Sequence, residues 1–365
     1  MAKTARLLAV GDLQLGDSAT CVGFGFRSKV STKRLEFALR DFTAAMGESA
    51  LTFANLETPL SDTGLEPSGR HSRQLRGRPD YVTALRAAGF TVVNVANNHS
   101  LEHGPGAFLD SVSRVEAAGI EVVGKRGAGE WSSQPVTITL SGLRVGILGY
   151  TLRRTPENVE RLHAEPNEAE MRADVARLRA SVDTVIVSLH WGEEFVQVPS
   201  MSEVELAHAL VDAGASLILG HHPHVARPVE RYRDAVIAYS LGNFVADMIW
   251  HAPLRRGLVL DCELMVGGVA GVRVHETRID DGYLPRVDLD SSVAVATPVS
   301  IAPLPQDAYI SQARATVQAQ RRALYGYTVR NAWRFEPRML LDLALKTVRG
   351  KLGALSGRSR DAIWG

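Results

Sequence analysis

Side chains that can bind metal ions follow five short apolar runs of this sequence. They carry carboxylate, amide and imidazole groups and are Asp12, Asn55, Glu57, Asn97, Asn98, His99, His190, His221, His222 and His224. Each of them alone has an ordinary structural explanation, such as a helix cap, a turn or a hydrogen-bonded histidine. Gathered in one place, such groups would be costly to bury and would repel one another unless a cation lay among them. The sequence therefore predicts a metal centre.

The mixture of ligand types narrows the choice of metal. Imidazole and carboxylate ligands together suit Zn, Mn or Fe, and Mg would fit if the carboxylates dominate. His222 and His224 are separated by Pro223. Alternate residues of an extended segment could reach two neighbouring metal ions, and Pro223 would stiffen that segment.

The apolar runs are rich in Val, Ile and Leu, which is typical of buried strands. They cover residues 6–12, 50–57, 91–99, 183–190 and 215–222. Periodic patterns between them predict helices over residues 33–46, 79–88, 106–118 and 202–213, the last capped by Ser202 and ended by Gly214. This alternation predicts an α/β domain, in which ligand sites lie at the carboxyl ends of strands. The polar residues stand at those ends.

Two further pairs of strands are predicted from turn residues. Residues 136–140 and 143–150 flank Ser141 and Gly142, and a second pair surrounds Gly267 and Gly268 within residues 257–278. Both patterns are typical of hairpins, whose strands run antiparallel. The sheets should therefore mix parallel and antiparallel pairing.

The pattern changes after residue 290, so we predict one α/β domain over residues 1–290 and an extension over residues 291–365. The extension opens on a linker with Pro298, Pro303 and Pro305 and continues as helix-like stretches over residues 308–325 and 337–352. From residue 312 onward it holds 11 basic and 3 acidic residues, a local charge of +8. We expect these helices to pack on the outside of the domain. A membrane-surface helix over residues 340–348 is an alternative that fits the pattern less well.

Composition excludes several classes of protein. Lys and Arg number 41 against 40 Asp and Glu, so the net charge of +1 gives no general attraction to nucleic acid. Two cysteines, Cys21 and Cys262, are too few for a disulfide framework. The first residues show no leader pattern, and no run of about 18 apolar residues could span a membrane. These features predict a cytoplasmic protein.

Six strings of the sequence resemble the signature motifs of the CapA (PGA_cap) capsule-synthesis family, which is itself similar to the calcineurin-like metallophosphoesterases. They are GDLQLG (11–16), FANLETPLS (53–61), ANNHSLEHG (96–104), LHWGEEF (189–195), GASLILGHHPHV (214–225) and YSLGNFVAD (239–247). The resemblance implies a four-layer sandwich of two mixed β-sheets flanked by helices. It also implies a centre of two divalent metal ions between the sheets.

The resemblance also assigns roles to residues. Glu57 would bridge the two metal ions, Asp12 and His224 would complete one site, and the other would be completed by Asn98, His190 and His222. His99, beside Asn98, would act on the substrate as an acid or charge stabiliser without binding metal. The residues expected to support the ligands or the substrate are Gln14, Asn55, Asn97, Glu102, His103, Glu194, His221 and Asn243. His221 is also the alternative to His222 as a ligand.

Two positions depart from the family pattern. Gln14 stands where the superfamily commonly has a histidine, so one metal ion could be held loosely. Glu102 and His103 stand where the family usually has an aspartate and an aromatic residue, which affects how the substrate would be positioned.

Three functions are consistent with these residues. The first is a metal-dependent hydrolase, because paired cations generate a nucleophile from water and offset developing charge. Its substrate would be a phosphoester, or an amide or γ-glutamyl small molecule. The second is a component of poly-γ-glutamate or capsule biosynthesis that acts with partner proteins. The third is a metal-binding module without turnover, which Gln14 suggests and the intact Asn98–His99 pair disfavours.

Overall fold

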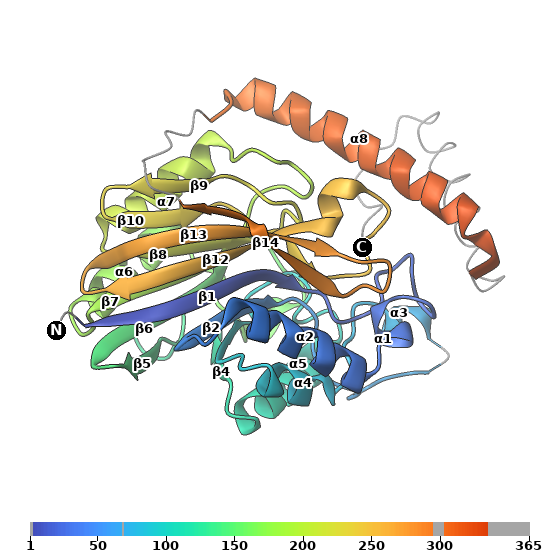
Figure 1. Ribbon diagram of the computed structural model, residues 1–365, viewed down its shortest axis with the longest axis horizontal. Coiled ribbons are helices and arrows are strands. Elements are labelled where there is room, and N and C mark those ends of the chain that lie inside the picture. The colour runs from blue at the N-terminus through green and yellow to red at the C-terminus, as the bar shows by residue number, and fades with distance from the viewer. Residues whose placement is uncertain (1–2, 68, 295–302, 335–365) are drawn as a thin grey trace.

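Two mixed β-sheets lie face to face at the centre of the fold (Figure 1). The computed structural model describes residues 3–67, 69–294 and 303–334. The first sheet has the order β14-β13-β12-β1-β2-β3-β4, and β11 pairs with β1 beside this path. Its strands are β1 (Thr4–Leu13), β2 (Leu51–Leu56), β3 (Val92–Asn94), β4 (Glu121–Val123), β11 (Asn243–Val245), β12 (Arg256–Met265), β13 (Gly268–Ile279) and β14 (Pro285–Ala294).

The second sheet has the order β5-β6-β7-β8-β10-β9. Its strands are β5 (Val136–Leu140), β6 (Leu143–Thr151), β7 (Thr184–His190), β8 (Leu217–His221), β9 (Val229–Tyr232) and β10 (Ala235–Ala238). Each sheet joins a parallel centre to antiparallel edges, at β12 to β14 in the first and at β5 and β9 in the second. The predicted mixture of pairings is confirmed, and both predicted hairpins are present.

Three apolar cores hold four layers together, because alternate residues of a strand face opposite sides of its sheet. Leu7 and Phe53 of the first sheet pack against Ile147 and Leu217 of the second. The opposite face of the first sheet is covered by α2 (Thr32–Met46), α4 (Tyr81–Ala87) and α5 (Gly104–Ala117), and that of the second by α6 (Glu168–Arg179) and α7 (Met201–Asp212). The predicted sandwich of two mixed sheets flanked by helices is thus confirmed.

The helices match the predicted ranges closely, with two corrections. Ser200, and not Ser202, caps α7, because its hydroxyl accepts the Glu203 amide while the Glu203 carboxylate accepts the Ser200 amide. Helix α6 was not predicted. Half of its residues are charged, so its apolar periodicity is weak, and a similar capping box formed by Asn167 and Glu170 begins it. The remaining short helices are α1 (Phe26–Lys29), α3 (Arg70–Arg73), η1 (Asn158–Glu160), η2 (Ala252–Arg255) and η3 (Ala332–Arg334).

Helix α8 (Gln306–Arg330) lies across the outside of the sandwich (Figure 1, orange-red). Tyr309 donates to Glu203 of α7, Gln320 contacts His251, and the Tyr327 ring lies 6.2 Å from that of Trp250. The second predicted helical stretch, residues 337–352, lies outside the described residues. Strand β14 runs to Ala294, and the division of the chain at residue 290 stays a prediction. Within the described part of the chain, no helix has the length and apolar character needed to cross a bilayer.

Candidate metal centre

The predicted polar residues meet where strands of both sheets end. Asp12 and Asn55 are paired in register near the ends of β1 and β2, and His190 and His221 are paired at the ends of β7 and β8. Gly11 makes this meeting possible, because a Cβ there would lie 1.9 Å from the Gly242 carbonyl oxygen. The Asp12 amide donates to the same carbonyl at 2.9 Å. The backbone therefore fixes Asp12 at the centre of the edge.

A chain of amides holds the carboxylate of Asp12. The Nδ2 of Asn55 donates to Asp12 Oδ1 at 2.9 Å and lies 3.3 Å from Nδ1 of His190. The Oδ1 of Asn55 accepts from Nδ2 of Asn94 at 3.1 Å. Sequence reasoning missed Asn94. The residue that could have pointed to Asn94 is Gly149, because a side chain there would leave no room for the Asn94 amide: a Cβ at Gly149 would lie 2.3 Å from its oxygen.

The six predicted ligands form one connected, largely buried cluster. His224 lies 3.3 Å from Asp12 and 3.5 Å from Glu57, measured from ring nitrogen to carboxylate oxygen. His190 Nε2 lies 3.7 Å from Glu57 Oε1 and 2.7 Å from Asn98 Oδ1. His222 joins Glu57 and His224 in a group whose ligand atoms all lie within 4.8 Å of one another. The structure therefore brings these residues together, and their roles as ligands stay predictions.

Several atoms of this cluster have no hydrogen-bond partner among the described residues. Both carboxylate oxygens of Glu57 and both ring nitrogens of His222 are buried without a hydrogen bond. Buried polar atoms without partners are costly, and metal coordination removes that cost. Carboxylate and imidazole together form a suitable donor set for Zn, Mn or Fe. The residues present therefore fit a metal centre.

The backbone that carries His222 and His224 is strained. Their φ angles are 93° and 58°, in the left-handed region that non-glycine residues rarely adopt. The predicted extended segment around Pro223 is thus wrong, because β8 ends at His221 and the chain turns immediately. The turn directs His222 and His224 toward Glu57 and leaves His221 beside Asp12, with its Nδ1 3.3 Å from Oδ1.

Electrostatics in the cluster follow from burial and from close opposite charges. Burial raises the pKa of Glu57 and lowers those of His190 and His222 well below their ordinary value. Burial alone would lower the pKa of His224, but Glu57 and Asp12 raise it. Burial alone would raise the pKa of Asp12, but His221 and His224 hold it well below its usual range. A bound cation would keep Glu57 ionised and the histidines neutral.

His99 lies at the rim of the cluster with a carboxylate partner. Its Nδ1 is 2.9 Å from Glu102 Oε2, and its Nε2 is 3.1 Å from the Asn98 amide nitrogen. Gln74 donates to the other oxygen of Glu102 at 2.7 Å. Burial alone would lower the pKa of His99, but the hydrogen bond with Glu102 raises it. Glu102, one of the departures from the family pattern, therefore fixes the ring of His99.

The other predicted supporting residues divide into two groups. Asn243 contacts His224 directly, with Oδ1 2.9 Å from Nδ1, and the buried Gln14 has an unpaired side-chain oxygen. Asn97 and His103 hold backbone instead, since Asn97 donates to the Leu56 carbonyl and His103 contacts the Gln74 carbonyl.

Glu194 is half-buried in the loop after His190. Its negative charge raises the pKa of Glu57 and of His224. Hydrogen bonds to the His190 ring, within the described residues, come from Asn55 and Asn98 and not from Glu194. Glu194 therefore acts on the cluster through its charge and does not hold the His190 ring.

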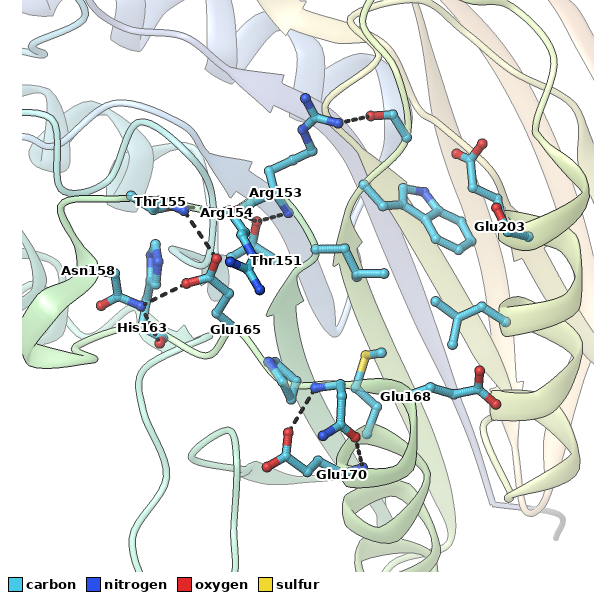
Figure 2. Close-up of a pocket in the computed structure, with 18 of the residues that line it drawn as sticks. Thr151, Arg153, Arg154, Thr155, Asn158, His163, Glu165, Glu168, Glu170 and Glu203 are labelled. Atoms are coloured by element: carbon cyan, nitrogen blue, oxygen red, sulfur yellow. Dashed lines mark hydrogen bonds between the residues drawn. The ribbon is translucent and has the colours of Figure 1, made fainter. Parts of the chain in front are cut away.

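A cavity of about 1120 Å³ lies on the outer side of the second sheet (Figure 2). Two of its lining residues are neighbours of His190, since Thr151 pairs with His190 and Trp191 follows it in the chain. Figure 2 shows Glu165 accepting hydrogen bonds from the Thr155 amide and from Asn158, which ties down the loop on one side. The beginnings of α6, α7 and α8 close the rest.

Residues 6–248 match the model of the family described as "Bacterial capsule synthesis protein PGA_cap". The chain belongs to this family. That span contains all six predicted ligands, and PGA_cap membership confirms the resemblance drawn from the motifs.

Curated relatives agree with this assignment. The capsule biosynthesis protein CapA of Bacillus anthracis is 31% identical over 286 residues, covering 75% of this chain and 67% of that protein. The PGA biosynthesis protein CapA of Bacillus subtilis is 33% identical over 205 residues, covering 54% of this chain but only 53% of that protein. The chain thus spans about half the length of the second relative. A hypothetical protein from Thermus thermophilus resembles the fold weakly, with 16% identity, a TM-score of 0.42 and coverage of 79% of this chain and 98% of that one.

Proposed function

We propose that this PGA_cap protein is a metal-dependent hydrolase with two divalent cations, acting on a phosphoester or on an amide or γ-glutamyl small molecule. One observation carries the proposal. Glu57, His222 and His224 place buried ligand atoms within 4.8 Å of one another, and neither the carboxylate oxygens of Glu57 nor the ring nitrogens of His222 make a hydrogen bond among the described residues.

The ligands divide between two ions as follows. Glu57 would be shared by the two ions, Asp12 and His224 would complete one site, and Asn98, His190 and His222 would complete the other. The ions are Mn, Zn, Fe or Mg, and the first three suit the imidazoles best. When bound, such ions lower the pKa of water and offset charge on the attacked phosphoryl or carbonyl oxygen. Asn243 orients the ring of His224, because its oxygen accepts the proton on Nδ1 and leaves Nε2 for a metal ion.

His99 supplies the acid. Because Glu102 lies 2.9 Å from Nδ1, Nε2 is the ring nitrogen left to act on a leaving group. In the structure Nε2 accepts from the Asn98 amide, so this contact must open before Nε2 can carry the proton. The contact with Glu102 also raises the pKa of His99, so more of the ring is protonated near neutral pH. Asn98 thus has two tasks, as metal ligand and as the neighbour that positions His99 Nε2.

The cavity on the outer side of the second sheet favours an anionic substrate. Three of its arginines, Arg126, Arg154 and Arg161, are exposed and have no ion-pair partner among the described residues. The carboxylates that line the cavity already have partners within the protein. Glu165 accepts hydrogen bonds from Thr155 and Asn158, and Glu170 and Glu203 belong to capping boxes. The other two form ion pairs, Glu168 with Arg172 and Glu193 with Arg153. Phosphate and γ-glutamyl carboxylate groups both match these free guanidinium groups.

The test is metal analysis of the purified protein together with a substrate screen in added Mn, Zn and Mg. Bound metal with release of phosphate, or of an amine from a γ-glutamyl substrate, supports the proposal. An Asp12→Asn variant is the control for contaminating hydrolases, because it removes a proposed ligand. Metal without turnover on any of these substrates would favour the metal-binding module instead, to which Gln14 would contribute its unpaired oxygen.

The second candidate is a component of poly-γ-glutamate or capsule biosynthesis that acts with partner proteins. The family description and the names of both Bacillus relatives favour it. Activity that appears only when the partner proteins and their membranes are added back would select this function over a free hydrolase.

A further inference from the structure

The end of α8 exposes an apolar stripe that the rest of the fold does not explain. Tyr325 is 64% exposed, Val329 57% and Trp333 78%. Tyr325 and Val329 are four residues apart on α8 and lie on one side of it, and Trp333 follows in η3, just past the end of the helix. The opposite side already holds α8 in place, because Leu324 and Tyr327 are buried and Tyr327 packs with Cys21 and Phe24. The stripe therefore adds nothing to the packing of α8.

Arginines surround the stripe. Residues 303–334 contain five arginines and a single acidic residue, Asp307, which lies at the far end of α8. Arg321, Arg322, Arg330 and Arg334 flank the apolar residues, and none of them has an ion-pair partner within the described residues. The Arg334 guanidinium lies 4.9 Å from the centre of the Trp333 ring. We call these seven residues, the four arginines with Tyr325, Val329 and Trp333, the outer face of α8.

We propose that the outer face of α8 docks on the surface of an anionic lipid bilayer. Trp and Tyr prefer the interface between water and lipid, where their rings are buried and their polar atoms stay hydrated. Arginines beside them are attracted by anionic headgroups, and each basic residue near such a surface strengthens binding about fivefold. The combination of an exposed apolar stripe with unpaired cations is the composition of an interfacial helix.

Two other occupants are disfavoured by charge. The first is the segment that follows α8 in the chain. Residues 335–365 contain six basic and three acidic residues, so their net charge is positive, like that of the outer face. A second copy of the chain that docked through its own outer face would present the same arginines and would also be repelled. An anionic surface is the partner whose charge is complementary.

Co-sedimentation of the full chain with vesicles tests the proposal. We expect binding to phosphatidylglycerol vesicles, little binding to phosphatidylcholine vesicles, and weaker binding in high salt. For the double variant Tyr325→Ser/Trp333→Ser, the partition coefficient onto vesicles should fall at least tenfold. Arg321→Gln/Arg322→Gln should lose about tenfold or more on anionic vesicles only. Phe37→Ser is the control, because Phe37 is 68% exposed on α2, away from the outer face. No binding of the wild type, or an equal loss in the control, would overturn the proposal.

A polarity-sensitive fluorophore at position 329 identifies the occupant. Cys21 and Cys262 are both fully buried, so a cysteine introduced by Val329→Cys can be labelled selectively. Anionic vesicles should shift the emission to the blue. Emission that is already blue-shifted without lipid, and does not change when vesicles are added, would show that protein covers the face and would refute bilayer docking.

Discussion

Replacing His224 with Asn should remove a metal ion from the protein. His224 is held at Nδ1 by Asn243, which leaves Nε2, 3.5 Å from Glu57 Oε1, as the ligand atom, and the shorter Asn side chain does not reach that position. A ligand present at a hundredfold excess over its Kd stabilises a protein by about 2.7 kcal/mol. At about 2 °C per kcal/mol for a large domain, the variant should unfold about 5 °C lower in saturating metal.

The matched variant is His99→Asn, which removes an imidazole from the same site without removing a proposed ligand. It should keep both metal ions and unfold close to the wild type in saturating metal. Its turnover should fall about a hundredfold, because the group held by Glu102 no longer protonates or stabilises the leaving group. Metal content by mass spectrometry, thermal unfolding with and without added metal, and turnover are measured on both variants. Equal metal loss in the two would make His99 a ligand and would refute the assignment.

Three further outcomes are expected. Gly11→Ala should lower the free energy of unfolding by about 1–3 kcal/mol or more and reduce the metal content, because the new Cβ would lie 1.9 Å from the Gly242 oxygen. Gly271→Ala is the control, because Gly271 has open space around it, and it should change neither quantity in denaturation and metal assays. Burial and then Asp17 raise the pKa of Asp247 to about 7, so the free energy that this carboxyl contributes to folding is lost as pH rises from about 4 through about 7. Urea unfolding of Asp247→Asn across that range should show a shallower decline than the wild type, and parallel curves would contradict the assignment. A chain ending at Gln312 should keep its metal, because every proposed ligand precedes that residue, and metal loss would show that the tail completes the site.

The types and order of the proposed ligands were predictable from sequence. Asp12, Glu57, His190 and His222 each come at or just after the end of an apolar run, and the carboxyl ends of parallel strands share one edge of a sheet. That rule depends only on backbone direction. The same reasoning gave α2, α4, α5 and α7, whose apolar residues recur with helical spacing.

Contacts between distant segments could not be predicted in this way. Asn94 supports Asn55 only because Gly149, from the other sheet, leaves room for its amide. Glu102 looked like a departure that would disturb substrate binding, yet the turn after β3 places it against His99. Neither arrangement leaves a periodic pattern in the sequence, because each depends on how two separate segments approach.

The turn at His222 and His224 shows the same division. Sequence alone determined that histidines follow β8, and local stereochemistry favoured an extended path around Pro223. The tertiary structure decided otherwise, with φ of 93° and 58° at the two histidines. The packed sheets fix both ends of this turn, so the backbone accepts a conformation that is unfavourable for an isolated segment. Sequence thus determined which candidate ligands are present, and the packing of the two sheets determined where they point.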